Sequence, residues 1–476
     1  MLQKVVDDNS QYFGNSFSRE RGVAFFSQGS YGYRNRYVLA GTLNYEGTNQ
    51  LGRSRSARWL PTWNISGRWN VSNEAFLANN KVVSNLAFRL SYGLIAGLAN
   101  AGNALPIFNS GITSRYLNSQ NERRIYIASL QNSNLTWEKV YETNFGTDIG
   151  FLSNAISLSV DLYQKNSKDL LDIVRTSGMG GEMNKYANDA SMTTRGVELV
   201  LDTRNFKTED FTWSTSVNFA YFNQEITSLA NASNSVFNLV RETGGNVLGN
   251  PRNTLYSYDF AGLNSQGMPL LNLKGGSRDY KDIDFQDRDN ILSYLKKEGA
   301  VDPNITGGLS NTFRYKNWEL NFLITMQAGN KIRKAPLYKG AGYDDLSVFP
   351  REFKNRWVAP GDEALTQIPG IVSQRTLNEE NKAYISRAYS AYNHSTARVV
   401  DGSFVRMKSI SLSYTFDKEV LENLNLGNLT LRLQASNPFL IYAHKDLNGQ
   451  DPEFFRSGGV AYPITPQYTF TINLGI

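Results

Sequence analysis

The sequence has no cysteine and only two histidines among its 476 residues. Without cysteine there is no disulfide, no iron–sulfur cluster, no thiolate zinc site and no thiol nucleophile. His394 and His444 lie in different segments, and sequence neighbours such as His394, Ser395 and Asp401 rarely form a catalytic triad. We therefore expect no metal site, no cofactor and no catalytic residue, and we do not expect an enzyme.

Charge and long apolar runs are also scarce. Charged residues make up 19% of the chain, against about 25% in soluble globular proteins. The net charge of +6 is spread without a basic run typical of nucleic-acid binding. No apolar run approaches the roughly 20 residues of a membrane-spanning helix, and the start, MLQKVVDDNSQYF, lacks the regions of a signal peptide. Two or three soluble domains, or one very large β-structure, remain as alternatives.

Alternation of apolar and polar residues with a period of two dominates the chain, as in FTWSTSVNFAYF, WELNFLITMQAG and YTFTINLGI. Such segments often run well beyond the usual 5–6 residues of a soluble strand, and a tilted membrane-spanning strand needs about 9–11. Aromatic residues gather at strand ends, where an interfacial girdle would lie. The members are Trp137, Tyr163, Trp213, Tyr221, Trp318, Phe416 and Tyr442. The pattern favours a membrane barrel, with a large soluble β-protein as the alternative.

The pattern predicts thirteen spanning strands separated by alternating short and long connections, as in outer-membrane barrels. The predicted strands are 22–33, 37–46, 61–71, 84–95, 135–150, 156–165, 195–204, 211–226, 305–316, 318–332, 404–416, 429–443 and 463–476. The long connections fall near 47–60, 96–134, 166–194, 227–304, 333–403 and 444–462. We place a strand-like patch at 255–263 inside the fourth long connection, and a short helix in DKEVLENL. An odd strand number indicates a fragment, because single-chain bacterial barrels have even numbers.

Several stretches, in this order, resemble one family. They include YGYRNRYVLAGTLNYEGTNQLG, NSNLTWEKVYETNFGTDIGFLSNAISLSVDLYQKNSKDLL, SFVRMKSISLSYTF and DPEFFRSGGVAYPITPQYTFTINLGI. From about residue 19 onward the chain resembles the C-terminal half of SusC/RagA-like TonB-dependent outer-membrane transporters of Bacteroidetes. The resemblance implies an all-β fold, a transmembrane antiparallel β-barrel with about 13–14 of its 22 strands present and no plug domain. Residues 1–20 would be a remnant of the upstream barrel, and 21–476 the C-terminal portion of the barrel.

The resemblance also implies a function. Family members import nutrients too large for porins, typically oligosaccharides or peptides, across the outer membrane. The implied partners are a SusD-like surface lipoprotein that acts as a lid, the TonB complex through the missing N-terminal part, outer-membrane lipids and the barrel-assembly machinery, but no nucleic acid. The alternatives are another TonB-dependent receptor of the siderophore or cobalamin type, a passive porin-like channel, and a soluble secreted β-rich adhesin.

The resemblance places a C-terminal assembly signal on Tyr468, Phe470, Ile472, Leu474 and Ile476, although the family usually ends on an aromatic residue. Substrate contacts are expected in the loops near 96–134, 227–304 and 333–403, which are rich in Tyr, Phe, Asn and Arg, without assignment of single residues.

Charged segments leave further alternatives open. The acidic stretch with Asp279, Asp282, Asp284, Asp287 and Asp289 is either a solvated loop or a calcium site at Asp282–Asp289. Basic segments at 34–36 and 53–59 fit contact with anionic lipid headgroups or lipopolysaccharide at the two rims, whereas a lumen-facing arginine such as Arg432 could bias the pore toward acidic solutes.

Overall fold

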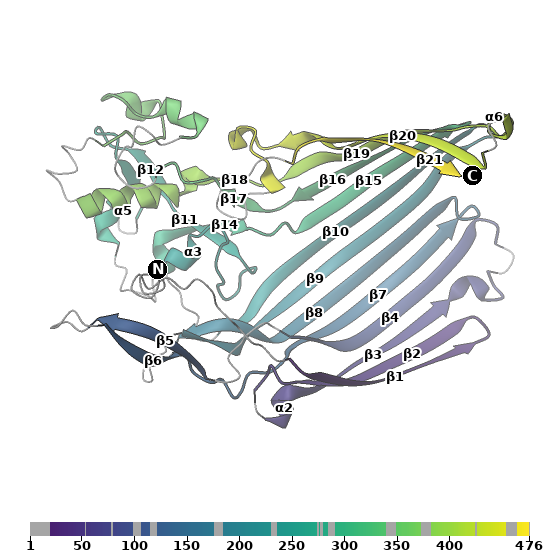
Figure 1. Cartoon of the computed structure of the whole chain (residues 1–476), viewed down its shortest axis with the longest axis horizontal. Coiled ribbons are helices and arrows are strands. Elements are labelled where there is room, and N and C mark those ends of the chain that lie inside the picture. Colours follow the sequence, from purple (N-terminus) through teal and green to yellow (C-terminus); the bar gives the residue numbers. More distant parts are fainter. Residues whose placement is uncertain are drawn as a thin grey trace, which may run out of the picture.

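The structure of the chain is a computed structural model (Figure 1). It describes residues 20–52, 54–77, 80–98, 106–114, 121–175, 184–229, 236–273, 276, 279–283, 291–338, 349–372, 382–423, 426–453 and 464–475. Predictions that fall on residues 1–19, on the Gly-rich segment 176–183 or on Ile476 lie outside the described residues.

One antiparallel sheet of thirteen strands accounts for most of the described chain. Neighbours in the sheet follow the sequence order, with the strands of the long connections left out. The strands are β1 Gly22–Tyr33, β2 Tyr37–Thr48, β3 Trp59–Asn70, β4 Val83–Gly97, β7 Glu138–Phe151, β8 Ile156–Arg175, β9 Asn184–Lys207, β10 Phe211–Leu229, β15 Ile305–Tyr315, β16 Trp318–Ala328, β19 Phe404–Thr415, β20 Asn428–Ala443 and β21 Gln467–Gly475. The thirteen predicted spans are confirmed in number and order.

The sheet curves into part of a barrel wall, with its tight connections at one end and its long connections at the other (Figure 1). We call these the turn end and the loop end. At the turn end, Arg34 and Asn35 both have positive φ, at 52° and 53°, and the amide of Arg36 donates to the carbonyl of Tyr33 at 3.0 Å. Two central residues with positive φ match the right-handed twist of the flanking strands. The predicted helix in DKEVLENL is confirmed as α6, Lys418–Asn423.

Three predicted boundaries are wrong at the loop end. The connection placed at 166–194 is largely strand, because β8 runs to Arg175 and β9 begins at Asn184. The pairing slips beyond Ser167, where Asp169 has a φ of 56°, and such a bulge breaks the alternation by which we recognised strands. Conversely, β16 ends at Ala328 rather than at 332, before Gly329 with a φ of 84°.

The long connections form small sheets and short helices of their own. The pairs are β5 Ile107–Ser114 with β6 Asn121–Ser129, β11 Thr254–Tyr258 with β14 Leu295–Ala300, β12 Phe260–Leu263 with β13 Pro269–Leu271, and β17 Lys331–Arg333 with β18 Val399–Asp401. The patch at 255–263 is therefore outside the large sheet, as predicted. The helical segments are α2 Arg55–Arg58, η1 Val71–Asn73, α3 Val236–Leu239, η2 Tyr280–Asp282, η3 Ile291–Tyr294, η4 Arg351–Asn355, η5 Asp362–Ala364, α5 Lys382–Asn393, η6 Thr396–Arg398 and η7 Lys445–Leu447.

Candidate functional site

The convex face of the sheet is apolar and exposed. Register places Leu39, Leu90, Leu433 and Phe470 on this face, and each side chain is more than half exposed. Apolar surface of this extent is not left in water by a soluble monomer. Lipid is the solvent that such a face requires. None of the helices among the described residues combines the length and the hydrophobicity of a membrane-spanning helix.

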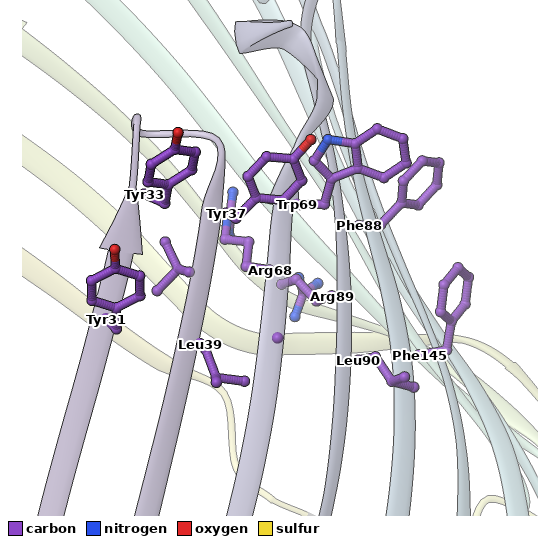
Figure 2. A pocket seen from close by; sticks show the side chains of 12 residues that line it. Tyr31, Tyr33, Tyr37, Leu39, Arg68, Trp69, Phe88, Arg89, Leu90 and Phe145 are labelled. Carbon is purple, nitrogen blue, oxygen red and sulfur yellow. The ribbon is translucent and has the colours of Figure 1, made fainter.

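Aromatic rings form a girdle on this face at the turn end. The rings of Tyr37 and Trp69 stack with centroids 6.4 Å apart, and Phe88 continues the row at 6.1 Å from Trp69 (Figure 2). On the other half of the sheet, the ring centroids of Trp318 and Tyr414 lie 4.8 Å apart. The girdle predicted from the sequence is thus present, and the structure adds rings that were not named.

Two of the predicted girdle residues lie elsewhere. Trp137 is buried under the loop end against Leu51 and Leu135, where its indole donates to the carbonyl of Arg58 at 3.1 Å. Tyr163 stands opposite Gly196, on the polar face. The prediction used only the position of each ring near a strand end. That position does not determine the face of the sheet from which the ring projects.

Glu74 fixes part of the girdle. Its carboxylate accepts hydrogen bonds from the hydroxyl of Tyr37 at 2.7 Å and from the indole of Trp69 at 3.1 Å. The guanidinium of Arg36 lies 3.0 Å from its other oxygen. The hydrogen bonds from Tyr37 and Trp69 hold the pKa of Glu74 below its usual value. This carboxylate therefore remains charged and keeps both rings oriented along the rim.

The concave face is polar and carries a balanced ion-pair network. The guanidinium of Arg89 on β4 lies 3.1 Å from Asp148 on β7 and 3.0 Å from Asp161 on β8. Arg68 on β3 lies 3.3 Å from Asp148. Two positive and two negative groups balance here, and their ion pairs link β3, β4, β7 and β8 across the polar face. Arg432 also belongs to the concave face, opposite Ser413 and Thr471.

Two of the long connections pack into one body at the loop end, the described residues of 236–300 and 331–403, which we call the loop assembly (Figure 1). Helix α5 joins its two apolar cores: Ile385 and Tyr389 enter one and Ala391 enters the other. The remaining members of the first core are Val236, Leu239, Val240, Val247, Tyr256, Tyr258, Leu271, Leu273, Ile283 and Ile291, and those of the second are Leu337, Tyr338, Phe353, Val372 and Tyr392.

Buried polar side chains lock the loop assembly together. Arg333 is 2% exposed and donates to the carbonyls of Ser395 and Tyr256 at 3.1 and 2.7 Å. Burial lowers its pKa to about 10, so it stays charged at neutral pH. The amide oxygen of Asn393 accepts from the backbone amide of Leu337 at 2.9 Å, and its amide nitrogen donates to the carbonyl of Tyr338 at 2.7 Å. These contacts join segments more than fifty residues apart.

Three ion pairs hold the edges of the loop region. Glu352 lies 2.6 Å from Arg398 and 2.9 Å from Lys334. Burial alone would raise the pKa of Glu352, but these two cations bring it below its usual value. Nearer the wall, Arg406 on β19 donates to both carboxylate oxygens of Asp451 at 2.5 and 2.6 Å, with both side chains buried. None of these buried groups was singled out from the sequence, because isolated charges in a loop carry no periodic signal.

The sequence-predicted sites have mixed outcomes. Asp279 accepts a hydrogen bond from the hydroxyl of Tyr384 at 2.6 Å, whereas residues 284–290 of the acidic stretch lie outside the described residues. Among described residues, no group of three or more His, Cys, Asp or Glu side chains is placed to hold a metal ion. The ring of His394 lies 2.8 Å from the carbonyl of Ser390, and the hydroxyl of Ser395 donates to the carbonyl of Tyr392.

Comparison with known proteins assigns this architecture to a family. A family model described as TonB dependent receptor-like, beta-barrel matches residues 3–324. The chain belongs to the TonB-dependent receptor β-barrel family. The TonB-dependent receptor SusC of Bacteroides thetaiotaomicron is 26% identical, over 96% of this chain and 44% of the relative. TonB-dependent receptor P39 of Formosa agariphila is 25% identical, over 97% of this chain and 46% of the relative.

The fold of this TonB-dependent receptor chain matches a solved member. The RagAB peptide importer in its closed-closed state aligns with a TM-score of 0.76 at 22% identity, over 96% of this chain and 48% of that chain. The chain thus spans a little under half the length of the relatives it matches. Receptors of this family reside in the outer membrane, with short turns toward the periplasm and long loops outside. The turn end of the sheet is therefore periplasmic and the loop assembly is extracellular.

Proposed function

We propose that this chain supplies the C-terminal barrel portion, residues 21–476, of a SusC-like importer that carries oligosaccharides or peptides across the outer membrane. Residues 1–20 would then belong to the upstream barrel. The observation that carries the proposal is the packed loop assembly standing at the extracellular end of a polar wall. Its two apolar cores and buried arginines give a surface of fixed shape, as recognition of a large solute requires.

The proposal includes energy from the TonB complex, acting through a part of the receptor that precedes these strands. The two edge strands of the sheet support this proposal, because all residues of β1 and nearly all residues of β21 are exposed. Further strands of the receptor could therefore pair with both edges. Unpaired backbone groups cost several kcal/mol each in lipid, roughly as estimated for isolated polar groups. A complete barrel in which further strands pair with β1 and β21 removes that cost.

A SusD-like surface lipoprotein is the proposed lid. The loop assembly presents Val358 at 65% and Leu365 at 85% exposure, and apolar side chains on a rigid surface suit protein docking. We expect Val358→Asp together with Leu365→Asp to reduce co-purification of the lipoprotein with the receptor. The matched control is Phe76→Asp, because Phe76 is an exposed apolar residue at the periplasmic end. This variant should leave co-purification unchanged.

The deciding experiment is uptake by cells. A strain without the receptor gene is compared with a complemented strain, using fluorescent oligosaccharide and peptide pools, with and without a protonophore. The proposal expects uptake of one pool, only in the complemented strain, and loss of that uptake when the proton gradient is dissipated. Uptake that continues without the gradient would instead identify a passive channel, and uptake of neither pool would reject the proposed nutrient class.

The proposal also assigns the C-terminal strand to recognition by the assembly machinery. Along β21, Tyr468, Phe470, Ile472 and Leu474 stand opposite Ala435, Leu433, Leu431 and Leu429 on the lipid face. These are the described members of the predicted signal, and their continuous apolar row is what supports its assignment.

A further inference from the structure

A hollow of about 430 Å³ interrupts the lipid face beside the periplasmic girdle. Tyr37 and Leu39 on β2, Trp69 on β3, Phe88 and Leu90 on β4, and Phe145 on β7 surround it (Figure 2). Tyr31 and Tyr33 extend the wall on β1. Its size lies in the range of roughly 300–1,000 Å³ found for small-molecule sites. Arg68 and Arg89, which are paired with Asp148 in the ion-pair network of the concave face, are also among its lining residues. None of its lining residues belongs to the loop assembly.

Gly67 creates the hollow. On the lipid face of β3 it follows Trp63 and Ile65 and precedes Trp69, so it is the one residue of that row without a side chain. Its register neighbours are Leu39 and Leu90. A Cβ placed on Gly67 would meet no atom within 4 Å. The glycine is therefore not needed for backbone packing, and the empty volume above it is open to the membrane.

The rim of the hollow carries a positive charge at the level where lipid phosphates lie. The guanidinium of Arg34 stands 5.1 Å from the centroid of the Tyr33 ring, which lines the hollow. Arg34 is exposed, and no carboxylate of the described chain pairs with it. Its neighbour Arg36 is already engaged by Glu74 at 3.0 Å. Arg34 is thus the cation available to an anionic headgroup, beside a girdle that marks the membrane interface.

We propose that this hollow is a binding site for one phospholipid of the periplasmic leaflet, with an acyl chain over Gly67 and an anionic headgroup at Arg34. Aromatic and aliphatic side chains enclose the acyl chain, and the turn after β1 positions the phosphate. A lipid held there stabilises the early strands of this chain, at the side where the wall continues beyond β1. The site is independent of which nutrient the receptor carries.

The test uses receptor purified from outer membranes and placed in vesicles of phosphatidylethanolamine with phosphatidylglycerol that carries a photoactivatable acyl chain. Adducts are located by mass spectrometry. In the unaltered receptor they should concentrate on β2, β3 and β4 near the girdle. Adducts spread evenly over the lipid face would overturn the proposal, and this measurement needs no variant.

Filling the hollow provides the second measurement. Gly67→Leu should reduce adducts at the girdle by roughly 15-fold, because a leucine displaces about two methylene groups worth a factor of about four each. Gly29→Leu is the matched control, since Gly29 also lies on the lipid face and its added Cβ would meet no atom within 4 Å. Unchanged labelling in a folded Gly67→Leu receptor would refute the site.

The headgroup has its own variant. Arg34→Gln should lower labelling by the phosphatidylglycerol probe and leave labelling by a phosphatidylcholine probe unchanged. Equal loss with both probes, or tighter retention of lipid A than of phospholipid, would overturn the assignment of the ligand. Heat modifiability on gel electrophoresis shows for each variant that the barrel is folded.

Discussion

Replacing Asp451 by asparagine tests whether the outer end of β19 is clamped to the loop that follows β20. One guanidinium nitrogen of Arg406, Nη2, donates to both carboxylate oxygens of Asp451, and both side chains are buried. Removing one partner of a buried pair costs about 3–5 kcal/mol, because the remaining charge is left uncompensated. Glu453 lies 3.4 Å from the Nε of Arg406 and takes up part of that charge. We therefore expect Asp451→Asn to lower the free energy of opening this loop by about 3 kcal/mol, the lower end of that range.

Hydrogen exchange of the backbone amides in 444–453 measures this cost directly. A loss of about 3 kcal/mol in the opening free energy corresponds to exchange roughly 150-fold faster. Asp401→Asn is the control, because its pair with Lys331 at 3.1 Å is about one-third exposed and such pairs contribute at most about 1 kcal/mol. Exchange in Asp451→Asn that rises no more than in the control would refute the clamp.

A double replacement separates loss of the charge pair from loss of packing. Arg406→Met combined with Asp451→Leu leaves no charge unpaired, and an apolar pair of similar volume is often as stable as the ion pair it replaces. We expect exchange in this variant to return toward that of the unaltered receptor. If exchange in the double variant is as fast as in Asp451→Asn, the hydrogen bonds between Arg406 and Asp451 hold the loop themselves. The loss of about 3 kcal/mol would then not come from an uncompensated charge.

Three further predictions concern the loop assembly and the last strand. Because its two basic partners lower the pKa of Glu352, its stabilisation is present at neutral pH and is lost as the pH falls below its ordinary value of 4.5; Glu352→Gln should remove this dependence in a protease-sensitivity titration of the loops. Asn393→Leu leaves buried backbone groups unpaired and should destabilise the loop assembly by about 2–4 kcal/mol, as seen by exchange in α5. Phe470→Asp places a charge on the lipid face, at a cost below the roughly 2–4 kcal/mol of a basic residue at the bilayer midplane, and should reduce the heat-modifiable barrel in outer membranes. Thr471→Asp should not, because residue 471 faces Arg432 on the polar side.

Most of the wall could be predicted from the sequence. Each strand contacts lipid on one face and a polar interior on the other, so its composition alternates, and segments such as 211–222 reveal a strand without any tertiary information. The short turns could be predicted equally well, because YRNR supplies the short connection that β1 and β2 require. Where a bulge breaks the alternation, as near Asp169, the prediction ended the strand too early.

The loops followed no such rule. Their long stretches without a period were predicted only as irregular, yet they hold the buried apolar cores and Arg333, whose partners Tyr256 and Ser395 lie 77 and 62 residues away in sequence. Such contacts depend on how separate connections pack against each other in space, and this packing cannot be predicted from the composition of each connection. The same holds for the hollow over Gly67, which exists because its neighbours across β2 and β4 are large.

By itself, then, the sequence determined that the chain is built of long strands with one apolar and one polar face, because two different environments impose a period of two on every strand, and this pattern favoured a membrane barrel. Only the tertiary structure decided which rings join the girdle, which charges are buried, and where the wall leaves room for a ligand. Those features arise between strands and loops that are distant in the chain, where packing rather than periodicity sets the outcome.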